Sequence, residues 1–221
     1  ALGANLIDAV HASGIKHFVL HTLPDYNALS NGKYPTPHCD IKASLKCYTK
    51  SLDIPASFVE VAFYYENFFS FFLLQQDRDG SFSFGFPQGD TPLAMTSVRD
   101  TGPIVSAIFE HPIEYIGRTV GVVGANDNCH QYAATMSKVL HRNIRYNYIP
   151  HNTYAALGFP GAEELANMFE VQRLHTPTRQ LDLIESYGLN PGMQTFEAWL
   201  IEHKQWFDTY FKQVEADALY A

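Results

Sequence analysis

Residues 14–24 read Gly-Ile-Lys-His-Phe-Val-Leu-His-Thr-Leu-Pro, and this stretch decides the fold. Its middle, residues 17–22, is an apolar run of the length of one strand. Before it, Leu2, Leu6 and Val10 recur at i, i+4 and i+8, which predicts a helix with one apolar face. A helix, a glycine turn and an apolar strand are the returning half of a β–α–β unit. The sequence therefore predicts an α/β protein.

Downstream, strands and helices alternate at first, and helices then dominate. The loop 23–37 follows the end of a strand, where α/β proteins place their sites. Further strands are expected at 57–62, 81–86, 119–123 and 144–149. Helices are expected at 38–52, 64–76, 100–111, 128–141, 152–158, 162–175, 180–187 and 195–210. This order predicts the second half of a doubly wound sheet followed by a smaller, helix-rich C-terminal lobe.

The composition restricts the class of protein. Of the 221 residues, 46% are hydrophobic and 17% charged, which is typical of a globular chain. With 15 basic and 23 acidic residues, the net charge of −8 disfavours direct nucleic-acid binding. No apolar run has the length of a membrane span, and no secretory signal is visible. Three cysteines indicate a reducing compartment, here the cytoplasm, the nucleus or both. Since Ala1 opens directly into a helical pattern, we expect a C-terminal part of a longer protein.

Two short motifs are candidates for chemistry. His38 and Lys42 lie one helical turn apart, so a proton acceptor and a fixed positive charge would share one face. An ordinary solvated helix start is the simpler interpretation of the same spacing. The histidines and cysteines do not have metal-ligand spacing, so no metal site is expected. Gly121-Val-Val-Gly-Ala125 lacks the full dinucleotide fingerprint and is interpreted as a strand that ends in a turn.

The segment Phe63-Tyr-Tyr-Glu-Asn-Phe-Phe69 is unusually aromatic. In one interpretation, Glu66 and Asn67 contact a ligand and the aromatic rings stack around it. In the other, the segment is a helix buried on all sides in the hydrophobic core. The phenylalanines from 68 to 72 are too many for one helix face, so some must meet a second surface in the helical lobe or in another chain.

Several segments together resemble the NmrA-like family, a subgroup of the atypical short-chain dehydrogenase/reductase superfamily. The resemblance covers nearly the whole chain and is carried by residues 14–24, 38–42, 63–68, 89–103 and 157–169. It implies an NAD(P)-binding Rossmann fold whose glycine-rich first β–α–β unit is missing here. On this basis we expect residues 1–125 to be mainly the remainder of that domain, with 75–100 partly in the second lobe. Residues 126–221 would form the smaller helical lobe.

The resemblance also implies site residues. Ordinary short-chain dehydrogenases use a Tyr-x-x-x-Lys pair; Lys42 matches the lysine, but His38 stands at the tyrosine position. Thr22 falls near the usual serine, and Lys42 would contact the ribose of NADP or NAD. The resemblance places four further residues on the nicotinamide side, namely Tyr64, Tyr65, Glu66 and Asn67.

The resemblance and the residues themselves leave three functions open. The leading one is a non-catalytic redox-state sensor that binds NAD(P) and acts through a protein partner, such as a transcription factor or a metabolic enzyme. The second is an NAD(P)H-dependent reductase of a quinone or other aromatic substrate, with Lys42 essential and His38 or Tyr34 as the acid. The third is an interaction module without nucleotide, whose exposed aromatics at 64–74 form a partner or homodimer surface.

Overall fold

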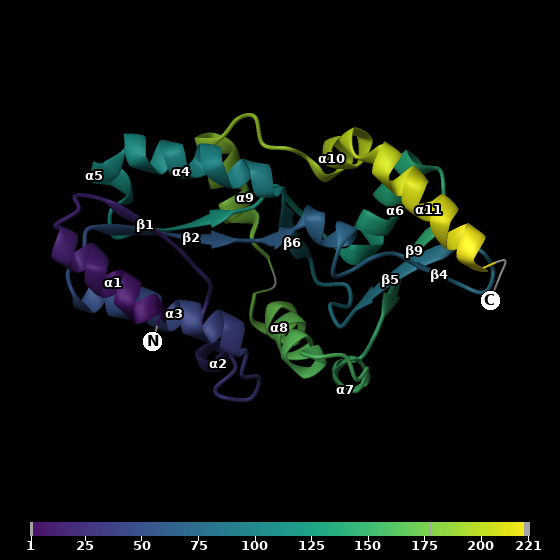
Figure 1. Ribbon diagram of the computed structural model, residues 1–221, viewed down its shortest axis with the longest axis horizontal. Coiled ribbons are helices and arrows are strands. Elements are labelled where there is room, and N and C mark those ends of the chain that lie inside the picture. Colours follow the sequence, from purple (N-terminus) through teal and green to yellow (C-terminus); the bar gives the residue numbers. More distant parts are fainter. Residues whose placement is uncertain (1, 177, 219–221) are drawn as a thin grey trace.

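A computed structural model describes residues 2–176 and 178–218 (Figure 1). Strands run through the middle of an elongated molecule, with helices on both sides. The helices are Leu2–Ser13 (α1), Tyr26–Leu29 (α2), Pro37–Ser51 (α3), Thr101–Glu110 (α4), Pro112–Tyr115 (α5), Cys129–Leu140 (α6), His151–Ala155 (α7), Ala162–His175 (α8), Gln180–Leu189 (α9), Phe196–Glu202 (α10) and Lys204–Ala218 (α11). The strands are Phe18–Thr22 (β1), Ala56–Val61 (β2), Phe63–Tyr64 (β3), Gln75–Gln76 (β4), Phe82–Phe86 (β5), Leu93–Thr96 (β6), Thr119–Val122 (β7), Ala125–Asp127 (β8) and Ile144–Tyr148 (β9).

The first sheet is parallel, in the order β1-β2-β7, and it confirms the predicted α/β fold class. Successive side chains of a strand point to opposite faces. Phe58 of β2 accordingly packs with Ile7 of α1 and Leu20, whereas the neighbouring Val59 packs with Ile104 of α4. Helices therefore cover both faces, as in a doubly wound fold.

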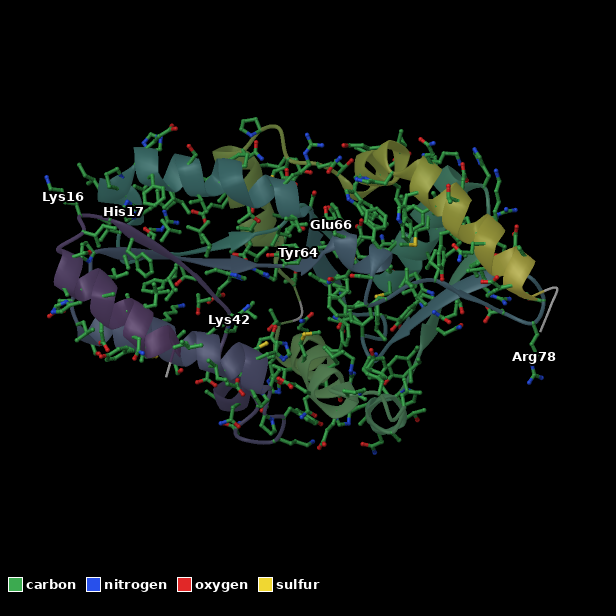
Figure 2. All side chains as sticks on the ribbon, in the orientation of Figure 1. Lys16, His17, Lys42, Tyr64, Glu66 and Arg78 are labelled. Atoms are coloured by element: carbon green, nitrogen blue, oxygen red, sulfur yellow. The ribbon has the colours of Figure 1, made fainter. Side chains whose placement is uncertain are left out.

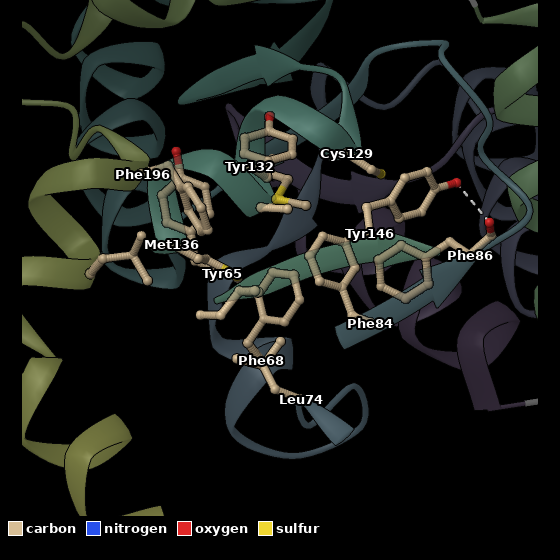
Figure 3. Close-up of a cluster of buried hydrophobic side chains, with 14 of the residues drawn as sticks. Tyr65, Phe68, Leu74, Phe84, Phe86, Cys129, Tyr132, Met136, Tyr146 and Phe196 are labelled. Carbon is tan, nitrogen blue, oxygen red and sulfur yellow. Dashed lines mark hydrogen bonds between the residues drawn. The ribbon is translucent and has the colours of Figure 1, made fainter. Parts of the chain in front are cut away.

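The other strands form two small sheets, β3-β6-β8 and β4-β5-β9, beside a second core. This core is built largely from aromatic rings (Figure 3). Phe86 of β5 stacks on Phe169 of α8 with ring centroids 4.7 Å apart. The Tyr146 hydroxyl donates to the Phe86 carbonyl at 2.8 Å, which links β9 to β5 inside the core. Burial of so many rings supplies most of the driving force for this half of the molecule.

Helix α9 returns to the first sheet and covers the outer edge of β7. The carbonyls of Arg118 and Val122 accept hydrogen bonds from the β2 side, so the intervening Gly121 carbonyl faces away from β2. Ser186 of α9 donates to that carbonyl at 2.9 Å and accepts from the Val123 amide at 3.0 Å. One hydroxyl thus takes the place of the backbone groups of a neighbouring strand.

The domain boundary expected at residue 125, between the remainder of the Rossmann domain and the helical lobe, stays a prediction.

Gly121 allows this close approach. A Cβ atom at position 121 would lie 2.3 Å from Cγ of Asp182, which rests directly on the strand. The segment 121–125 is a strand end and turn between β7 and β8, so the simpler interpretation of its glycines is confirmed.

The predicted helix at 64–76 is wrong. Tyr64 instead pairs with Thr96 of β6, a 3-10 helix follows over Tyr65–Phe69, and β4 closes the segment. The rings explain the difference, because Phe69 packs on Trp199 of α10 while Phe72 packs on Phe86. One regular helix could not direct them into both places. The second surface that these rings required is therefore the C-terminal helices and β5.

Two other expectations need correction. The helix expected at 195–210 is divided at His203 into α10 and α11. In α1, the buried residue is Ile7, whereas Leu2 and Leu6 are 87% and 55% exposed. The helix rests on α3 through Gly3, where a Cβ would lie 2.6 Å from the Leu45 side chain. The contact face is therefore rotated away from Leu2 and Leu6.

Candidate functional site

A cavity of about 810 Å³ lies beyond the carboxyl ends of β1 and β2. His21 and Leu23 contribute to its wall from the end of β1, and Glu60 from β2. The start of α3 and one face of α8 supply other parts of the wall, as does the segment that enters α9. Ligands of parallel α/β sheets bind at this end of the strands. The loop after the first strand borders this cavity through Leu23, Pro24 and Tyr26.

Lys42 places a positive charge in the wall of this cavity. Figure 2 shows it on the side of α3 that faces the sheet. Its ammonium forms no hydrogen bond or ion pair with residues 2–176 or 178–218. The pKa of the adjacent His21 is lowered, first by burial and then by the positive charge of Lys42. A half-buried lysine whose ammonium has no counter-ion among the described residues favours an anionic or hydroxyl-rich ligand.

His38 lies one turn before Lys42 and also lines the cavity. Its Nδ1 is 2.6 Å from Oε1 of Glu164, and its backbone amide donates to the same oxygen at 2.7 Å. Burial acts to raise the pKa of Glu164, but these hydrogen bonds and the His38 charge together outweigh it and lower that pKa. The pair joins the start of α3 to α8, across one wall of the cavity.

We expect Glu164→Gln to lower the melting temperature near pH 6, because it removes a charge-assisted contact between α3 and α8. A carboxyl with a lowered pKa stabilises the fold above its ordinary value of 4.5 and loses that effect as the pH falls through the folded pKa. The difference in melting temperature from the parent protein should therefore shrink below pH 4.5. Thermal scans across pH check this, with the exposed Glu163→Gln as control. A difference that stays constant with pH would contradict it.

The residues predicted for the nicotinamide side divide into two groups. Tyr64 and Asn67 line the cavity. Burial, followed by the charge of Glu66, raises the pKa of Tyr64, so its hydroxyl stays protonated. Tyr65 and Glu66 are not part of the cavity wall. Tyr65 is buried in the aromatic core, and Glu66 accepts hydrogen bonds from Ser97, Val98 and Trp199.

Thr22 is buried and does not line the cavity. Its hydroxyl donates to the Lys42 carbonyl at 2.9 Å, so it fixes α3 on the end of β1. Tyr34, the other candidate acid, packs against the His151 ring at 5.2 Å and is also absent from the cavity wall. The structure thus brings together His38, Lys42, Tyr64 and Asn67.

Several cavity residues have no signal in the sequence. Arg179 donates to Asp182 at 2.7 Å and to the Glu60 carbonyl at 2.9 Å, which ties the entry of α9 to β2. Tyr154 and Phe159 come from α7 and the loop after it. They are remote in sequence from the first strands, and only the tertiary fold places them in the same cavity wall as Lys42. Cys39 is also in the wall, but burial raises the pKa of its thiol to about 12. It therefore lacks thiolate character.

The described residues contain no set of side chains that could bind a metal ion. Among residues 2–176 and 178–218, no group of three His, Cys, Asp or Glu side chains could hold an ion. Within the same ranges, no helix combines the length and the apolar character that a bilayer-crossing segment needs.

The family follows from a comparison of the whole sequence. The model of the NmrA-like family matches residues 1–200. The chain belongs to this family. Among curated relatives, NmrA, the nitrogen metabolite repression protein of Emericella nidulans, is 28% identical over 159 residues, which is 68% of this chain and 45% of that protein. An NmrA-like family domain-containing oxidoreductase, FrzB of Cladobotryum sp, is 25% identical over 186 residues, or 76% and 55% of the two chains.

A solved structure agrees with the fold. The negative transcriptional regulator NmrA in complex with NADP superimposes with a TM-score of 0.76 at 23% identity, over 90% of this chain and 68% of that one. The chain spans about half the length of the two curated NmrA-like relatives. The family therefore holds both a named regulator and a named oxidoreductase.

Proposed function

We propose that this NmrA-like chain is the non-catalytic, NAD(P)-binding part of a redox-state sensor. The observation that carries the proposal is the half-buried Lys42 side chain at the carboxyl ends of parallel strands, whose ammonium has no partner among residues 2–176 and 178–218. A ribose or phosphate of the dinucleotide would satisfy it. At the position that the resemblance assigns to the catalytic tyrosine of active short-chain dehydrogenases stands His38. The lost tyrosine supports binding rather than turnover.

Each residue then has a defined task. Lys42 contacts the ribose, while Tyr64 and Asn67 lie beside the nicotinamide. Thr22 acts indirectly by holding the backbone of Lys42, and Glu66 by holding residues 97 and 98. NADP in the related NmrA structure supports this dinucleotide as the ligand class, with NAD as the alternative. The bound dinucleotide would carry, at its nicotinamide ring, the redox state that the sensor distinguishes.

The redox state of the bound nucleotide is transmitted to a protein partner in the cytoplasm or nucleus. The regulator names among the relatives support a transcription factor as that partner, and a metabolic enzyme or a second copy is the alternative. Coupling requires that the nucleotide bind more tightly to one conformation than to the other. The net charge of −8 favours a protein over direct contact with nucleic acid.

Lys42→Ala is expected to weaken NADP and NAD binding by about tenfold, the loss of one charged contact. Isothermal titration calorimetry of both nucleotides measures this. Lys16→Ala is the matched control, since Lys16 is exposed at the left end of the molecule in Figure 2 and does not line the cavity. Equal affinities for the parent and Lys42→Ala would contradict the assignment of Lys42. Absence of binding to the parent protein would contradict the proposed function.

The His38–Glu164 pair favours a second candidate, an NADPH-dependent reductase of a quinone or other aromatic compound. A histidine held by a carboxylate one turn from Lys42 is a competent proton donor. The oxidoreductase names of some relatives support it. Quinone-dependent loss of NADPH absorbance, abolished by Lys42→Ala, would establish turnover. If no quinone of a panel is reduced, the reductase is contradicted and the sensor stays the proposed function.

A further inference from the structure

The carboxylates in the described wall of the cavity already face basic side chains. The three pairs are Glu60 with Lys46 at 3.1 Å, Glu164 with His38 at 2.6 Å, and Asp182 with Arg179 at 2.7 Å. Two further basic side chains of the wall, His21 and Lys42, have no carboxylate partner among residues 2–176 and 178–218. Any excess positive charge of the cavity is therefore concentrated at these two residues.

The end of β1 holds His21 and Lys42 near each other. Thr22, the residue after His21, donates its hydroxyl to the Lys42 carbonyl at 2.9 Å. The His21 side chain keeps part of its surface exposed. Burial, and then the positive charge of Lys42, lowers the pKa of His21, so the two side chains are close enough for their charges to interact. A proton on His21 adds a second positive charge at this end of the cavity.

The other titratable groups of the described wall do not balance this charge. Burial raises the pKa of Tyr26, Tyr64 and Tyr154, and it raises that of the Cys39 thiol to about 12. These four groups therefore stay protonated and uncharged at neutral pH. The second histidine of the wall, His38, faces the carboxylate of Glu164 instead of Lys42.

The two redox states of a nicotinamide dinucleotide differ in charge at one place. The oxidised nicotinamide ring carries a positive charge and the reduced ring is uncharged, while their phosphates are the same. A positively charged wall therefore repels the oxidised ring more than the reduced one. With its ribose on Lys42, a bound dinucleotide would place the ring, which is bonded to that ribose, close to this charge.

We infer that the basic end of the cavity, formed by His21 and Lys42, binds the reduced dinucleotide more tightly than the oxidised one, and that protonation of His21 enlarges the difference. The inference rests on the proposed function, because it places the ribose on Lys42. Lys42 contributes its charge at neutral pH, whereas His21 adds a charge only in acid. Acidification therefore shifts the sensor towards the reduced nucleotide.

Calorimetric titration of oxidised NADP and of NADPH gives the ratio of their dissociation constants, in which the contacts common to both nucleotides cancel. We expect NADPH to bind about threefold more tightly at about pH 8 and about tenfold more tightly at about pH 5.5. A histidine with a lowered pKa is neutral above its ordinary value of 6.5, so the ratio should grow below that pH. The tetrahydro analogue of NADPH, whose ring is also uncharged, is titrated in parallel because NADPH decomposes in acid.

Variants separate the two basic residues. His21→Gln should keep the preference at about pH 8 and lose its growth in acid, whereas His38→Gln should keep that growth. Lys42→Gln should bring the ratio close to one at about pH 8, because the affinity for NADPH falls further than that for NADP, and Lys42→Arg should retain the ratio. His11→Gln is the matched control, since His11 is exposed on α1 and outside the cavity wall.

Equal affinities for the two redox states, or tighter binding of oxidised NADP, would overturn the inference while nucleotide binding itself stands. Growth of the ratio in acid that persists in His21→Gln, or that disappears in His38→Gln, would overturn the role of His21. If the parent protein binds neither nucleotide, the proposed function is contradicted, and the inference is overturned with it.

Discussion

Trp199→Ala is expected to destabilise the protein by about 3–5 kcal/mol, the range for removal of a buried large aromatic side chain. The Trp199 ring is fully buried and stacks on Phe69 at 4.8 Å and on Phe196 at 6.0 Å. Its indole N–H also donates to Glu66 at 3.2 Å. The substitution leaves a cavity where α10 meets the aromatic core. Urea unfolding followed by circular dichroism measures the loss.

Trp206→Ala is the matched control, because the same atoms are removed from a side chain that is 36% exposed. Its loss of stability should be clearly smaller than that of Trp199→Ala. Comparable losses for the two variants would show that the aromatic core does not have the packing described.

Ser186→Ala is expected to cost about 2–5 kcal/mol, because two buried backbone groups, the Gly121 carbonyl and the Val123 amide, lose their partner together. Ser186 is fully buried, so a water molecule cannot easily take the place of the missing hydroxyl as hydrogen-bond partner. The same denaturation experiment applies. Hydrogen exchange should in addition show faster exchange of the Val123 amide, while the amides of β9 keep their relative protection.

The exposed Ser106→Ala on α4 provides the control, since its hydroxyl has one long contact with Glu110 at 3.3 Å. We expect a change below about 0.5 kcal/mol there. If Ser186→Ala were equally mild, the view that α9 completes the edge of β7 through this hydroxyl would be wrong.

The sequence predicted the long elements well, because their periodicity extends over many residues. β1, β2, β5, β7 and β9 lie where the apolar runs indicated. The strands β3, β4 and β8 were missed because two or three residues have too little pattern to detect, and the four-residue strand β6 was missed as well. The helix predicted at 64–76 failed for a different reason. Its rings satisfy two separate packing surfaces, which a local pattern does not encode.

The candidate site was predicted where its residues are close in sequence. His38 and Lys42 do share one face of α3 and one cavity wall. Thr22 and Glu66 were chosen with them, but their side chains bond to the backbone and to other core residues instead. Arg179 and Phe159 could not be found, because tertiary packing alone brings them to the carboxyl ends of the first strands. The cofactor roles of all these residues stay predictions.

The path of the chain between the two cores has a consequence for cooperativity. After β2 the chain enters the aromatic core, returns to the first sheet with α4 and β7, and leaves again for α6. It comes back once more with α9 and Met193 before α10 re-enters the aromatic core. A single cut therefore cannot give two fragments that each keep a complete core. The molecule should melt in one transition, and limited proteolysis should release no stable half.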